Sequence, residues 1–288
     1  YYWSPDNATP DRNPNYLIHN YPERWEKFIK YTHGQIDELM SGYGKIDILW
    51  LDGGWVQPYT EQQLWAYRTQ KNFKQVNLQS QDIRMNEIAE NSRKKQPGLI
   101  IVDRAVEGIH QNYITPENRV PDEAILVPWE SCITASIDGW SWRKEPNYKS
   151  AEEIIHTLTD IVSKGGNLLL NFAPGPLGDL DKEAYELMDS IGQWMKINSE
   201  AIYNSTPVKP YKEGKTAFTE NKKEQCIYAI YLPDKDEKII PKKIWIPAHC
   251  PQENGSVTLL GTDNKLEWER INDGFIITIP DPIQNNPP

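Results

Sequence analysis

The sequence predicts an α/β protein: a (β/α)8-like TIM barrel, of which only the C-terminal portion lies in this chain, followed by a β-sandwich domain. Three observations predict it. Short apolar segments alternate with amphipathic segments of helical period, which is typical of parallel α/β architecture. Each apolar segment ends in polar or aromatic residues, as the strands of barrel enzymes do. After about residue 203 the helical period disappears and short β-rich runs replace it.

The first elements follow one another closely. A helix is predicted over 20–43, where apolar residues recur at helical spacing between an early proline and a closing glycine. A nearly continuous apolar run over 46–51 predicts a buried parallel strand, because it is too short for a stable helix. A second helix is predicted over 82–95, and a second short buried strand over 99–102.

The next elements repeat the pattern. A third strand is predicted over 124–130, where apolar residues lead into a Trp-Glu pair. A helix over 150–164 opens with a Ser-x-x-Glu capping box and ends at two glycines. A fourth strand over 167–172 and a last helix over 181–196 follow.

The C-terminal part predicts antiparallel strands at 225–231, 243–246, 256–260 and 274–279. We therefore expect a catalytic barrel portion over 1–202 and a β-sandwich domain over 203–288. The parallel part holds roughly half of the about eight strands that close a barrel. We expect the remaining strands to precede Tyr1, outside this chain.

Composition excludes several function classes. The net charge of −10 and the pI near 5.1 argue against nucleic acid, whose phosphates require a basic surface. No apolar run is long enough to span a membrane. The 11 tryptophans and 15 tyrosines are many for this length, and they serve either core packing or sugar stacking. The three cysteines lack metal-site spacing and leave the redox compartment open.

The first predicted strand ends in a carboxylate and a flat aromatic ring, Asp52-Gly-Gly-Trp55. A carboxylate at a barrel lip beside a tryptophan platform suggests glycoside chemistry, although an aspartate can also cap a turn here. A retaining glycosidase needs two carboxyl groups about 5 Å apart and no metal or cofactor. Candidates for the second carboxyl are Glu107, Glu117 and Glu130, which the residues alone do not rank.

Three motifs, in order along the chain, resemble those of the glycoside hydrolase family 29 α-L-fucosidases. They are the strand and its lip at 43–55, the Val-Asp-Arg segment with its Asn-Tyr and Thr-Pro-Glu followers at 102–117, and the helix-to-strand segment at 158–171. The resemblance implies a (β/α)8-like barrel, a C-terminal β-sandwich and retaining, exo-acting hydrolysis of α-L-fucosides. The implied substrate is a fucosylated oligosaccharide or glycoconjugate, with no cofactor.

The resemblance also implies roles for individual residues. Asp52 matches the family's nucleophile, and Trp55 matches an aromatic that lines the fucose pocket. Tyr2 resembles a strand-end tyrosine that reaches the sugar. Trp140 and Trp142 resemble the family's Ser-Trp element near the pocket; which of them touches fucose stays open, and core packing is the alternative for both.

Two features depart from the family pattern. The family's paired fucose-binding histidines would lie upstream of this chain. The acid/base glutamate of this subgroup precedes Asn-Tyr, and that position is Gln111, which cannot deliver or accept the proton. Either another residue such as Glu107 is the acid, or the chain is an engineered variant that is inactivated at this position; we favour the second.

Two other functions remain open. The glutamine alone supports a non-catalytic fucoside-binding protein on a degenerate glycosidase fold. A carboxylate with tryptophan platforms also fits a barrel hydrolase for a different sugar. Glycosidases that degrade polymers are usually exported, so we expect a periplasmic or secreted protein whose signal lies outside this chain. The linkage preference is not readable from the sequence.

Overall fold

A computed structural model describes most of the 288-residue chain: residues 18, 21–52, 56, 58–69, 80–102, 104, 108–237, 239–262 and 264–281. The chain forms two compact units, residues 1–115 and residues 116–288.

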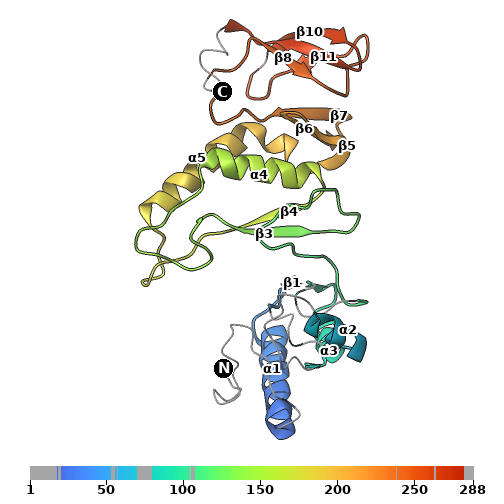
Figure 1. Ribbon diagram of the computed structural model, residues 1–288, viewed down its shortest axis with the longest axis vertical. Helices are drawn as coiled ribbons and strands as arrows, with labels where there is room; N and C mark the ends of the chain where they lie inside the picture. Colours follow the sequence, from blue (N-terminus) through green and yellow to red (C-terminus); the bar gives the residue numbers. More distant parts are fainter. Residues whose placement is uncertain are drawn as a thin grey trace. The chain divides into compact units, whose positions relative to one another are not determined.

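The first unit pairs two short parallel strands with helices (Figure 1). Its elements are α1 (Pro22–Gly42), β1 (Ile48–Leu49), α2 (Glu61–Arg68), α3 (Met85–Lys95) and β2 (Ile100–Ile101). In the parallel pair, Ile48 lies opposite Ile100 and Leu49 opposite Ile101. The predicted helices and both strands are confirmed, although the strands are shorter than their apolar runs. Helix α2 was not predicted.

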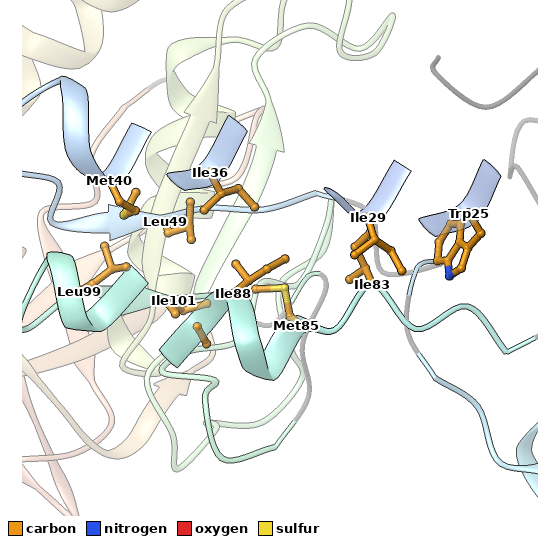
Figure 2. Close-up of a cluster of buried hydrophobic side chains, with 11 residues drawn as sticks. Trp25, Ile29, Ile36, Met40, Leu49, Ile83, Met85, Ile88, Leu99 and Ile101 are labelled. Atoms are coloured by element: carbon orange, nitrogen blue, oxygen red, sulfur yellow. The ribbon is translucent and has the colours of Figure 1, made fainter. Parts of the chain in front are cut away.

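The core of the first unit lies between α1, α3 and one face of the β1–β2 pair. Figure 2 shows its side chains, to which α1 contributes Trp25, Ile29, Ile36 and Met40. The register partners Leu49 and Ile101 are buried in this cluster. Their neighbours Ile48 and Ile100 alternate to the other face and are 49% and 39% exposed. Burial of each core Leu or Ile contributes about 1.5–3 kcal/mol, so α1 and α3 hold the strand pair mainly through this face.

The second unit contains the other parallel pair. Its first elements are β3 (Glu130–Thr134), α4 (Ala151–Ser163), β4 (Asn167–Asn171), α5 (Lys182–Asn198) and a 3-10 turn, η2 (Ser199–Ala201). Strands β3 and β4 run parallel, with Glu130 opposite Asn167 and Thr134 opposite Asn171. The predicted capping box of α4 is confirmed: Ser150 accepts from the backbone of Glu153, and Glu153 accepts from the backbone of Ser150.

The predicted third strand is wrong in its position. Residues 124–128 form no strand, Leu126 is 98% exposed and Val127 is half exposed. Pro121 and Pro128 flank this apolar run and lack the N–H that a ladder requires. The strand is instead Glu130–Thr134, whose last four residues are buried.

The rest of the second unit is antiparallel. Its strands are β5 (Thr206–Glu213), β6 (Thr216–Asn221), β7 (Cys226–Tyr231), β8 (Lys243–Ile246), β9 (Val257–Thr258), β10 (Lys265–Ile271) and β11 (Gly274–Thr278). They form two sheets, ordered β5-β6-β7 and β8-β11-β10-β9. Helix α4 packs against β4 on one side and against β5 and β6 on the other (Figure 1).

The division into domains at residues 202/203 stays a prediction. Only strands follow η2 among the residues that the structure describes between 206 and 278. Throughout the described ranges, no helix combines the length and the apolar character that a bilayer crossing demands.

Candidate active site

The candidate nucleophile lies at the carboxyl edge of the β1–β2 pair. Asp52 follows β1, and Arg104 follows β2. Because the two strands are parallel, both residues leave the sheet at the same edge. Arg104 Nη1 is 4.0 Å from Asp52 Oδ1, which confirms that the two strand ends meet there.

Arg104 packs against the aromatic ring of Trp50, whereas the carboxylate of Asp52 beside it is open to solvent. The guanidinium carbon lies 5.0 Å from the centre of the Trp50 ring, a cation–π contact. The Arg104 side chain is 19% exposed and the Asp52 side chain is 68% exposed. The arginine therefore places a partly buried positive charge next to a carboxylate that is open to solvent. The sequence reasoning missed this role, although the Asp-Arg pair directly after the second strand could have indicated it.

Gln111 is held on a tight turn after β2. Its backbone N–H donates to Gly108 O at 3.2 Å. Gly108 has φ +106°, a backbone conformation that residues other than glycine rarely adopt. Gln111 itself is half-buried. The turn therefore depends on the glycine, and it presents residue 111 after β2.

The residues after Gln111 are tied to β2. Asn112 N donates to Ile101 O at 2.8 Å, and Asn112 Oδ1 accepts from Ile101 N at 2.9 Å. Tyr113 then forms a parallel bridge with Val102. Position 111 is thus fixed relative to the strand whose end also carries Arg104.

The two candidate tryptophans lie in the second unit, in the loop after β3. Trp140 is 39% and Trp142 is 37% exposed. Trp142 lines a narrow cavity with Ser136, Asn171 and Ala173, which follow or end β3 and β4. Its Nε1 lies 3.4 Å from the point where a Cβ on Gly175 would stand. Trp142 therefore lies at the carboxyl ends of β3 and β4, the kind of edge where α/β proteins bind ligands.

A hydroxyl next to this cavity is held neutral. Tyr148 lines the same cavity and donates to Asp181 Oδ2 at 3.0 Å. Burial first, and then the hydrogen bond to the Asp181 carboxylate, raise the pKa of Tyr148 to about 12. Tyr148 therefore stays protonated and links the loop after β3 to the start of α5.

Several of the predicted site residues are not among the groups described above. Tyr2, Trp55 and Glu107 lie outside the described residues. Glu130 is the first residue of β3 and lies at the amino end of that strand. Its role as the second carboxyl stays a prediction. Within the described ranges, no three His, Cys, Asp or Glu side chains gather as metal ligands would.

Comparison with known proteins identifies the family of the chain. Residues 1–200 match the family model described as Alpha-L-fucosidase. The chain belongs to the α-L-fucosidase family. This confirms the family to which the three motifs pointed.

Curated α-L-fucosidases are similar over different lengths. The chain is 26% identical to the α-L-fucosidase of Branchiostoma floridae over 265 residues, which is 88% of this chain and 54% of that one. It is 30% identical to the human plasma α-L-fucosidase over 183 residues, 59% of this chain and 38% of that one. The chain spans about half the length of the first curated relatives that it matches.

Solved fucosidase structures share the fold. Isoenzyme 1 from Paenibacillus thiaminolyticus aligns with a TM-score of 0.66 at 22% identity, covering 97% of this chain and 65% of that chain. An α-L-fucosidase from Bacteroides thetaiotaomicron aligns with a TM-score of 0.68 at 19% identity, covering 93% and 62%. The second structure is described as a trapped covalent intermediate in complex with 2-fluoro-fucosyl fluoride, obtained with a glutamate-to-glutamine mutant.

Proposed function

We propose that this family member is a retaining exo-α-L-fucosidase that removes terminal α-L-fucose from glycans. One observation carries the proposal: Asp52 and the loop that carries position 111 both follow strands of one parallel pair, β1 and β2. The contact between Arg104 and Asp52 joins the ends of these strands. Two such groups that follow neighbouring parallel strands support a proposal of double displacement, which requires them to lie about 5 Å apart.

The reaction has two steps. In the first, an Asp52 carboxylate oxygen bonds to the anomeric carbon while the bond from that carbon to the leaving oxygen breaks, and a carboxylic acid at position 111 protonates the leaving oxygen. In the second, water attacks the anomeric carbon and gives its proton to the carboxylate at position 111. The bond to Asp52 breaks as the water oxygen bonds to that carbon, and the aspartate is released as a carboxylate.

The amide of Gln111 can perform neither proton transfer. With glutamine at this position, we expect attack by Asp52 to proceed only when the leaving group departs without a proton, and we expect the fucosyl-enzyme to persist. The trapped intermediate of the Bacteroides fucosidase, obtained with a glutamate-to-glutamine mutant, supports this expectation.

The finer features of the fold and the site belong to the same proposal. We infer that β1 to β4 are strands of a (β/α)8-like barrel and that residues 203–288 form a β-sandwich. Tyr2, Trp55, Trp140 and Trp142 would line the fucose pocket. The protein would act on a fucosylated oligosaccharide or glycoconjugate in the periplasm or outside the cell. A plasma α-L-fucosidase among the relatives supports an extracellular location.

Gln111→Glu tests the proposal directly. We expect turnover of phenyl α-L-fucoside to rise by about 10²–10⁴-fold, the usual contribution of general acid–base catalysis. Gln193→Glu adds the same charge on the exposed face of α5 and should leave turnover unchanged. No gain with Gln111→Glu, while Gln193→Glu behaves like the parent, would overturn the assignment of position 111.

Gln111 is the only support for the alternative, a fucoside-binding protein without catalysis, and the similarity to α-L-fucosidases does not favour that alternative. Incubation with 2-fluoro-fucosyl fluoride followed by intact-mass and peptide analysis separates the two. A fucosyl adduct on Asp52 eliminates the binding protein. Tight binding of a fucoside with no adduct supports it and contradicts the enzyme.

A further inference from the structure

Arg93 makes a set of contacts that the sequence analysis did not predict. It lies in the last turn of α3, where Lys94 and Lys95 follow it. Basic residues at a helix end usually complement the helix dipole and face solvent. Lys94 reaches Asn91 on its own helix, and Lys95 pairs with Asp37 of α1. Arg93 instead turns towards the loop after β2.

The guanidinium of Arg93 bonds to the residues on both sides of position 111. Nη2 donates to His110 O at 2.9 Å and to Asn112 Oδ1 at 2.7 Å. Nη1 lies 3.2 Å from His110 Nδ1. A guanidinium can only donate, so Nδ1 accepts this bond and the ring proton lies on Nε2.

The same side chain is anchored to the strand. Arg93 Nε donates to Leu99 O, the residue before β2, at 3.3 Å. Asn112 Oδ1, which accepts from Arg93, also accepts from Ile101 N within β2. One rigid fork of donors therefore joins α3, the start of β2 and both neighbours of Gln111. His110 is buried, at 8% exposure, so the loop cannot shift without breaking several of these bonds.

We propose that Arg93 is a positioning residue for the acid/base group at position 111, an inference that rests on the proposed function. The recorded bonds run to the backbone and side chains on either side of that position, so Arg93 acts through them. The group at 111 must donate a proton in one step and accept one in the next from the same place. Misplacement by about 1 Å can lower a rate by about 10²-fold, and the Arg93 fork prevents it.

The test uses Arg93→Met in the Gln111→Glu background. With phenyl α-L-fucoside, whose leaving group needs a proton, we expect kcat to fall by about 10²-fold with little change in KM. With 2,4-dinitrophenyl α-L-fucoside the first step should persist, because Asp52 is untouched and the leaving group needs no acid. Added azide should then raise turnover, because an anionic nucleophile needs no general base.

A double-mutant cycle separates positioning from general structural support. In the parent background with Gln111, we expect Arg93→Met to change the rate of adduct formation from 2,4-dinitrophenyl fucoside by less than about twofold, the limit for independent sites. A merely structural role would lower the rate in both backgrounds. Lys94→Met removes a charge from the same helix turn and should leave both backgrounds unchanged.

Arg93→Lys keeps the charge but loses the fork. If Arg93→Met fails to fold, the leaving-group dependence and azide response of Arg93→Lys decide the question. An unchanged kcat on phenyl fucoside in Arg93→Met or Arg93→Lys, with a gain from Gln111→Glu alone, overturns the role of Arg93 and leaves the proposed function standing. No gain from Gln111→Glu overturns both.

Discussion

The parallel strands β1 to β4 and the antiparallel strands β5 to β11 use polar side chains differently. At the edge of the β1–β2 pair, Asp52 keeps a 68% exposed carboxylate. In the antiparallel part, charges are paired with each other: Lys215 Nζ is 2.6 Å from Asp234 Oδ2 and 2.8 Å from Glu237 Oε2. On the proposed function, the exposed carboxylate faces the substrate, whereas the charges in the antiparallel part tie the turn between β5 and β6 to the loop after β7.

Asp52→Asn should give the largest effect, on activity alone. In the Gln111→Glu background we expect kcat to fall by about 10⁴-fold or more, as it does when a covalent nucleophile is removed. The free energy of unfolding should change by no more than about 0.5 kcal/mol, because the side chain is exposed. Steady-state kinetics and denaturant titration measure the two effects.

Trp245→Ala is the matched control in the antiparallel part, where this tryptophan on β8 is half exposed. We expect it to leave kcat and KM unchanged. If Trp245→Ala lowered activity as much as Asp52→Asn does, the proposed division of labour between the two parts would be wrong.

Gly274→Ala should give the largest effect on stability. A Cβ at the start of β11 would stand 2.2 Å from Ile246 O of the paired strand β8, and a backbone atom cannot turn away. We expect the free energy of unfolding to fall by about 1–3 kcal/mol, as overpacking does, while the kinetics of folded protein stay unchanged. Chemical denaturation measures the loss.

Gly192→Ala on α5 is the control, because its Cβ would meet no atom within 4 Å. Alanine there should raise the free energy of unfolding by about 0.5–1 kcal/mol, since it relieves the entropy cost of a helical glycine. Equal destabilisation by both substitutions would show that the close approach at Gly274 is not the cause.

A smaller effect should come from Glu153, which links α4 to the loop after β7. The hydrogen bond from Lys235, and then that from the Ser150 backbone, lower the pKa of Glu153 to about 2. A carboxyl with a lowered pKa stabilises the fold above its unfolded pKa, near 4.5, and loses that contribution as pH falls towards 2. For a solvent-screened pair we expect less than about 1 kcal/mol.

Denaturant unfolding between pH 5.5 and about 2.5 tests this contribution. Glu153→Gln should reduce the loss of stability over that interval, and Glu152→Gln should behave like the parent. The same slope in Glu153→Gln and in the parent would contradict the assigned link.

The sequence predicted the elements whose pattern is local. Helices α1, α4 and α5 follow from apolar period and caps, and α4 begins where its capping box predicts. Strands β5, β6 and β10 were not predicted: β5 contains two prolines, β6 is mostly polar and β10 is rich in charged residues. Their strand state comes from pairing with neighbours, which a single segment does not reveal.

The candidate site was predictable where a motif carries the chemistry. Asp52 and Gln111 could be chosen because one ends a strand and the other precedes Asn-Tyr in a recognisable segment. Arg104 could have been chosen in this way, because it stands in the Val-Asp-Arg motif, but Arg93 could not. Arg93 lies next to two lysines in the last turn of α3. Its contact with the loop after β2 depends on the path of the chain there, which the sequence of the helix does not reveal.

The side chain of Asn112 completes the hydrogen bonding of Ile101 as a neighbouring strand residue would. The loop at 108–113 is thereby part of the cooperative unit of β2 rather than an independently fluctuating surface segment. Amide hydrogen exchange at Asn112 would then require opening of the strand itself. On the proposed function, the loop that carries position 111 is therefore ordered before a substrate binds.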